Sequence, residues 1–106
     1  MHILIANFNL KDVGPDDFAT AMEEGASAFA AIPGLISKVY LADAQTNTYG
    51  GIYSWQDEQA MEDFMAGELW HFVETHPNVA NLTWRDFGIL EGPSRVTRGL
   101  AEVAAA

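Results

Sequence analysis

The sequence predicts an α+β fold, a ferredoxin-like βαββαβ sandwich with a four-stranded antiparallel sheet. Four segments alternate apolar and polar residues as strands do, and two others repeat apolar residues at helical spacing. Their order along the chain is β-α-β-β-α-β. Two helices can cover only one face of such a sheet, and the other face is also apolar. We therefore expect two sheets to associate in a homodimer.

The first strand is expected over residues 2–10, which carry apolar residues on both sides. Gly14-Pro15-Asp16-Asp17 opens the first helix, because proline fits a first turn and acidic residues favour the positive end of the helix dipole. Pro33-Gly34 ends this helix. Its apolar stripe consists of Phe18, Met22, Ala26 and Phe29.

Residues Pro33–Trp55 predict a β-hairpin with the polar segment Ala44–Thr48 as its loop. Lys38 lies inside the first of the two strands, on the same face as Tyr40. Gly50-Gly51 lies inside the second strand, and glycines there indicate a bulge or a close approach to the backbone. The combination suggests a sheet face built around a pocket.

The second helix can be capped by Ser54 or Asp57, and we expect Gly67 to interrupt it before His76-Pro77 ends it. Its apolar stripe is expected to consist of Met61, Phe64, Met65, Leu69, Phe72 and Val73.

The last strand is expected over Val79–Leu90, followed by an irregular segment after Gly92-Pro93. The predicted organisation is one domain over residues 1–99 and a C-terminal tail over residues 100–106, whose end resembles a frayed helix.

Charge and composition narrow the functional classes. The formal net charge of −10 comes from 15 acidic and 5 basic residues, so a phosphate backbone or an anionic membrane surface would repel the chain. Neither nucleic acid nor membrane is an expected partner. The absence of cysteine excludes disulfides and thiolate chemistry. The first residues lack the features of a signal peptide, so a cytoplasmic location is expected.

Several segments resemble the YdhR-type mono-oxygenase family of the dimeric α/β-barrel superfamily. They are PGLISKVY, GGIYSW, the Asp57-Glu58 helix start and EGPSRVTRG, and the likeness extends over nearly the whole chain. The resemblance implies a homodimer whose sheets face each other, with a small cavity in each subunit. It also implies oxygenation of aromatic or quinol-like substrates without a bound cofactor. The superfamily also includes isomerases, haem-degrading enzymes and stress-response proteins.

Oxygenation of this kind requires groups that move a proton and hold an oxyanion inside an apolar cavity. The candidate catalytic residues are His71, Lys38, Asn7 and Arg85. Each has a structural alternative. Lys38 could form an interface salt bridge, with Asp86 for example, and His71 could be exposed on the polar flank of its helix. Asn7 could be a strand-end amide, and Arg85 could stack or pair structurally.

Aromatic side chains could form the wall of a substrate cavity. The candidates are Trp55, Trp70, Tyr53, Tyr40 and Trp84. Aromatic residues at alternating strand positions also commonly form core or interface. No metal site is expected, because the spacing of His71 and His76 does not place both on one helical face and no third ligand accompanies them.

The leading hypothesis is a cofactor-independent monooxygenase that acts on a small hydrophobic aromatic molecule of anthrone or quinol type. Two alternatives remain open at this stage. The same cavity could serve an isomerase or cyclase, or the chain could be a non-enzymatic dimer that binds a small ligand in a stress response.

Overall fold

The computed structural model describes residues 1–100, so most of the predicted C-terminal tail, residues 101–106, lies outside the described residues. The element order confirms the predicted βαββαβ pattern. The strands are β1 (His2–Leu10), β2 (Leu35–Asp43), β3 (Thr48–Trp55) and β4 (Val79–Gly88). The helices are α1 (Pro15–Ala30), α2 (Glu58–Met65), α3 (Glu68–Thr75) and α4 (Glu91–Val96).

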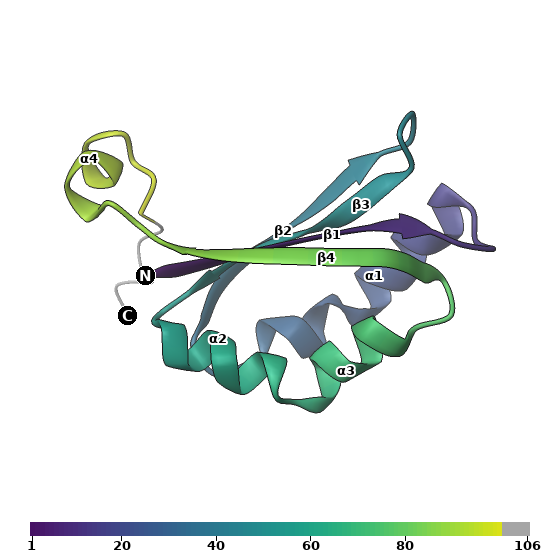
Figure 1. Cartoon of the computed structure of the whole chain (residues 1–106), viewed down its shortest axis with the longest axis horizontal. Helices are drawn as coiled ribbons and strands as arrows, with labels where there is room; N and C mark the ends of the chain where they lie inside the picture. The colour runs from purple at the N-terminus through teal and green to yellow at the C-terminus, as the bar shows by residue number, and fades with distance from the viewer. Residues whose placement is uncertain (101–106) are drawn as a thin grey trace.

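The four strands form one antiparallel sheet in the order β2-β3-β1-β4. Helices α1, α2 and α3 lie on one side of this sheet, and α4 lies beyond the end of β4 beside the N-terminus (Figure 1). The register aligns Lys38 with Tyr53, Tyr53 with Leu4, and Leu4 with Asp86. Because directly paired residues share a face, all four lie on the side that the helices cover.

Local sequence signals position the helices. Pro15 occupies the first turn of α1, with Asp16 and Asp17 beside it. Asp57 caps α2 by accepting a hydrogen bond from the Ala60 amide at 2.8 Å. Gly67 separates α2 from α3, as predicted, and α3 is a helix of eight residues.

Two expectations for the C-terminal part were wrong. The fourth strand ends at Gly88 and not at Leu90, because Gly88 pairs with His2, the first residue of β1. The segment around Gly92-Pro93 is not irregular but forms α4. Proline is tolerated there because a first helical turn has no internal partner for its amide.

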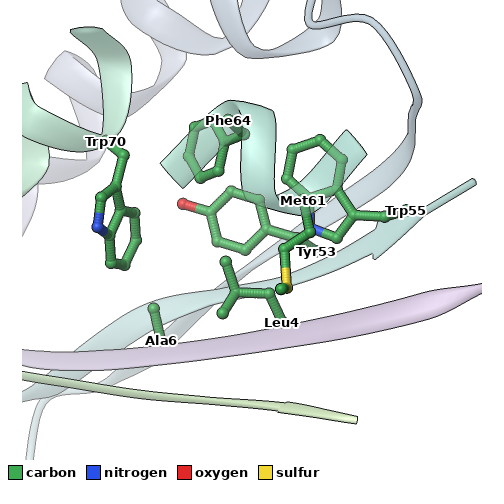
Figure 2. Close-up of a cluster of buried hydrophobic side chains, with 7 residues drawn as sticks. All are labelled: Leu4, Ala6, Tyr53, Trp55, Met61, Phe64 and Trp70. Atoms are coloured by element: carbon green, nitrogen blue, oxygen red, sulfur yellow. The ribbon is translucent and has the colours of Figure 1, made fainter. Parts of the chain in front are cut away.

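The core lies between the sheet and α2 with α3. Figure 2 shows its seven buried side chains, Leu4, Ala6, Tyr53, Trp55, Met61, Phe64 and Trp70. The Phe64 ring contacts the rings of both strand aromatics, with centroids 5.3 Å from Tyr53 and 5.1 Å from Trp55. The predicted stripe on the second helix is therefore correct for Met61 and Phe64.

The same stripe was wrong for Phe72, which is 57% exposed, while Trp70 is buried in its place. The break at Gly67 explains the change, because it restarts the helix with a new rotational phase.

The sheet face opposite the helices is uncovered within residues 1–100 and carries several apolar residues (Figure 1). Ile3, Ile5 and Ile52 are only partly buried there, and Val39 is 56% exposed. In the described part of the chain, no helix has the length and apolar character needed to cross a membrane.

Candidate active site

A small apolar cavity lies between the sheet and the helices α1 and α3. Its volume is about 150 Å³. The sheet contributes Ala6, Phe8, Lys38, Tyr40, Gly50, Gly51, Tyr53 and Val79 to the lining. The helices and their flanking loops contribute Val13, Phe18, Ala21, Met22, Phe29, Phe72, Val73, His76 and Asn78. An apolar cavity of this size holds a molecule of about the size of benzene.

Lys38 is the one lysine or arginine of this lining. Its Nζ atom lies 3.6 Å from the ring centroid of Phe29, 4.0 Å from that of Tyr40 and 4.7 Å from that of Tyr53. No carboxylate of residues 1–100 forms an ion pair with it. The amine is therefore surrounded by aromatic rings and lacks a counter-ion among the described residues.

Burial lowers the pKa of Lys38 from 10.5 to about 7, because the apolar surroundings disfavour the ammonium form. The rings oppose part of this effect, since a cation above an aromatic face is attracted to it. Burial also raises the pKa values of the Tyr40 and Tyr53 phenols, and the charge of Tyr40 raises that of Tyr53 further. A substantial fraction of Lys38 is thus a neutral amine near pH 7, while both phenols stay protonated.

Two glycines on β3 form the floor beneath Lys38. A Cβ atom at Gly51 would lie 2.9 Å from Lys38 Cε, so the missing side chain is what leaves room for the lysine stem. A Cβ atom at Gly50 would lie 1.9 Å from the carbonyl oxygen of Ala6 on β1. The glycine pair therefore marks a close approach, as the sequence suggested, and the strand pairing shows no bulge at these positions.

The cavity also contains a histidine that the sequence analysis did not assign to it. His76 follows α3, and its Nδ1 atom accepts a hydrogen bond from the Asn78 amide at 3.1 Å. This bond leaves the proton of the neutral ring on Nε2. The Phe72 ring packs edge-on against the imidazole, with centroids 5.0 Å apart.

The structure does not gather the four predicted catalytic residues around one cavity, and this corrects that expectation. Of the four, only Lys38 lines the cavity. His71 is exposed on α3, as its structural alternative stated. Asn7 lies on the uncovered face, because it shares the alternation of Ile3 and Ile5. Arg85 lies on that face too, with its Cζ atom 5.2 Å from the Phe87 ring centroid.

The predicted aromatic wall also divides into separate groups. Tyr40 and Tyr53 line the cavity. Trp55 and Trp70 are core residues, 0% and 2% exposed, and neither borders the cavity. Trp84 lies on the edge strand β4 and is 45% exposed, away from the cavity lining.

Asp86 does not pair with Lys38 within the chain, because the two residues lie on opposite edge strands with β3 and β1 between them. Its Oδ2 atom lies 2.6 Å from Nε2 of the buried His2, and Glu58 approaches the same nitrogen at 3.6 Å. One imidazole and two carboxylates are within reach of one another here. The short bond between His2 and Asp86 connects β1 to β4.

Comparison with protein families identifies one match to the chain. The family described as "Putative mono-oxygenase ydhR" matches residues 3–100. The chain belongs to the ydhR family. Comparison with curated protein sequences gives no match.

Solved structures show that this ydhR-family chain shares its fold with several proteins of known structure. A mutant of SnoaB, a cofactor-independent oxygenase from Streptomyces nogalater, is 20% identical with a TM-score of 0.67, covering 85% of this chain and 93% of its own. The heme-degrader MhuD from Mycobacterium tuberculosis, with two hemes in its active site, is 14% identical with a TM-score of 0.69, covering 85% and 96%.

A third similar structure is that of an antibiotic biosynthesis monooxygenase, assigned as putative, from Deinococcus radiodurans. It is 15% identical with a TM-score of 0.68, and the match covers 84% of this chain and 92% of its own. At these identities the likeness of the ydhR-family chain to the three proteins concerns the fold.

Sequence reasoning missed the cavity-lining role of His76 in this ydhR-family protein. The sequence does carry a usable signal, because His76 precedes Pro77 at the end of α3 and so leaves the helix in an extended conformation. The residue thereby turns away from the helix, and its ring borders the cavity. His71 has the apolar neighbours but remains within the helix and faces outward.

Proposed function

We propose that this ydhR-family protein is a cofactor-independent monooxygenase that acts on a small aromatic molecule of quinol or anthrone type. The observation that carries the proposal is Lys38, an amine among aromatic rings in an apolar cavity, without a counter-ion among residues 1–100. Such a site binds a flat apolar molecule and can hold either a neutral base or a cation next to it.

In the proposed reaction, neutral Lys38 removes a proton from an acidic O–H or C–H group of the substrate. The resulting ammonium then lies beside the substrate anion and stabilises it. The anion gives an electron to O₂, and the two radicals combine to form a C–O bond. The second oxygen atom leaves as water with two substrate hydrogens, so the substrate supplies every electron. Tyr40 and Tyr53 stay protonated and bind the ring.

The cavity dimensions favour one aromatic ring inside the fold. A larger ring system has room outside it, because an open apolar groove of about 570 Å³ shares Phe18, Met22 and Tyr40 with the cavity. One-ring hydroquinones and three-ring anthrones therefore test different parts of the site.

We also propose that the protein acts as a homodimer formed through the uncovered sheet face. Ile52, Val39 and Phe87 of that face would otherwise contact water over a wide area, which is unfavourable for a stable small protein. Under this arrangement Asn7 and Arg85 contribute to the contact between subunits, and His71 remains a surface residue.

Oxygen uptake in metal-free buffer, with hydroquinone and anthrone panels, tests the activity. We expect uptake above the uncatalysed rate, and a kcat/KM that rises as pH increases through about 7, where Lys38 loses its proton. Lys38→Met should reduce kcat/KM by about 10²-fold or more, whereas Lys11→Met, which alters the other lysine of the chain, should not.

Uptake no faster than in protein-free buffer would contradict the proposal, as would equal rates for the parent and Lys38→Met. Conversion that persists under argon would show that the cavity performs isomerisation or cyclisation.

A further inference from the structure

The environment of Lys38 supports a second kind of chemistry, which needs no oxygen. A lysine reacts as a nucleophile only in its neutral form, and enzymes that form imines on lysine place the amine in an apolar pocket. We propose that Lys38 captures small aromatic aldehydes or ketones covalently, as an imine within the cavity. This activity is separate from the oxygenation proposed above.

The first argument is the set of groups that face the amine. Lys38 borders the cavity on one side and a second hollow between β2 and α1 on the other. Across both, the other titratable residues are Tyr40, Tyr53 and His76, and none of the lining residues has a carboxylate. Nothing among the described lining residues therefore fixes the amine as an ammonium ion by pairing with it.

The second argument is the fit of the product. In the reaction, the amine lone pair attacks the carbonyl carbon and a C–N bond forms. The carbonyl oxygen then leaves as water with the two hydrogens of the amine, so no oxidant or reductant is consumed. When protonated, the imine is a cation at the position of Nζ. The ring centroids of Phe29, Tyr40 and Tyr53 lie 3.6–4.7 Å from Nζ, and these rings stabilise such a cation.

The third argument is access and space. Gly51 leaves the lysine stem unobstructed, and the 150 Å³ cavity accepts one aromatic ring next to the amine. The apolar lining also holds little water, which favours the dehydrated imine over the free carbonyl compound. An aldehyde attached to one aromatic ring is thus the ligand class that fits best.

Reductive trapping tests the proposal on the full chain. The protein is incubated at pH 7 with benzaldehyde and cyanoborohydride, which converts an imine to a stable secondary amine, and the modified residues are identified by peptide mass mapping. The chain has two lysines, Lys11 and Lys38, so Lys11 serves as an internal reference on the exposed surface. We expect at least about tenfold more benzyl label on Lys38 than on Lys11. Peptide mapping separates both from the Met1 amine.

Two controls distinguish capture in the cavity from general amine reactivity. Benzyl alcohol fills the same space but has no carbonyl group, so an excess should suppress labelling of Lys38 and leave Lys11 unchanged. Lys38→Arg keeps the positive charge and should lose the cavity label, while Lys11→Arg should keep it. Equal labelling of the two lysines, or no protection by benzyl alcohol, would overturn the proposal.

The outcome is independent of the oxygenase assay. Labelling of Lys38 without oxygen uptake would support the imine site and contradict the oxygenase. Oxygen uptake without selective labelling would support the oxygenase and contradict the imine site.

Discussion

At the scale of single residues, Lys38 has the most unusual environment in the described chain. A long charged side chain normally extends to water, but this one ends among three rings on the covered side of the sheet. The desolvation that makes the amine reactive also makes it costly for the fold. Function and stability are therefore opposed at this position.

Replacing Lys38 by methionine should stabilise the protein, by about 1–3 kcal/mol near pH 7. Methionine keeps most of the apolar stem and removes the buried amine. Because the folded pKa is lowered from 10.5 to about 7, the unfolded chain binds more protons than the folded one between these values. The stability of the parent protein should therefore rise as pH increases through that window.

Urea unfolding at about pH 7 and about pH 8.5 measures both effects, because tyrosines with a pKa of about 10 stay almost fully protonated at the upper value. The gain from Lys38→Met should shrink at the higher pH, and a control Lys11→Met should show no comparable gain. A gain of the same size at both pH values would contradict the assigned cost of burial.

At the scale of elements, the two glycines of β3 differ from the glycine inside α1. Gly50 lies against the β1 backbone, whereas a Cβ atom at Gly25 would meet nothing within 4 Å. Position 50 requires glycine because the neighbouring strand leaves no room for a side chain. Position 25 lies in a helix and has room for one, so glycine has no structural advantage there.

The substitutions Gly50→Ala and Gly25→Ala should consequently act in opposite directions. Gly50→Ala should cost more than about 3 kcal/mol, because β1 and β3 must separate to admit the methyl group. Gly25→Ala should stabilise by about 0.5–1 kcal/mol through the helix propensity of alanine. Thermal unfolding followed by circular dichroism compares the two, and a loss of stability in Gly25→Ala would refute this account.

The elements were largely predictable from the sequence, while the site was not. Alternation in β1 and in the hairpin, with the signals at Pro15 and Gly67, predicts most element boundaries because they are local properties. The cavity depends on how distant elements pack. His76 borders it and His71 does not, because of the rotational position of α3 and the turn before Pro77. The sequence alone does not show which helix will cover a lysine on a strand face.

At the scale of the whole molecule, one layer of helices covers one face of the sheet and leaves the other uncovered (Figure 1), with Val39 and Phe87 exposed on it. The proposed dimer buries this face. Val39→Glu would place a charge on this face, on the edge strand β2 next to Ile52. We expect the parent to elute at the mass of a dimer and the variant at that of a monomer, as measured by light scattering.

Val39 is 56% exposed in the single chain, so glutamate there should be tolerated by the fold itself. Asp43→Glu, which keeps the charge at the exposed end of the same strand, is the matched control and should remain dimeric. A parent protein that is monomeric at all concentrations would disprove the proposed assembly.

The floor of the cavity is backbone, and this has a consequence for how ligand preference can change. Since a side chain at Gly50 or Gly51 would collide with its neighbours, these two sheet positions cannot be used to reduce the binding space. The adjustable wall is α1, where Ala21 and Met22 border the cavity from a helix whose other side faces solvent. Substitutions at Ala21 or Met22 therefore change the ligand space without altering the pairing of the strands. New specificities can arise by substitutions on a single helix while the sheet stays as it is.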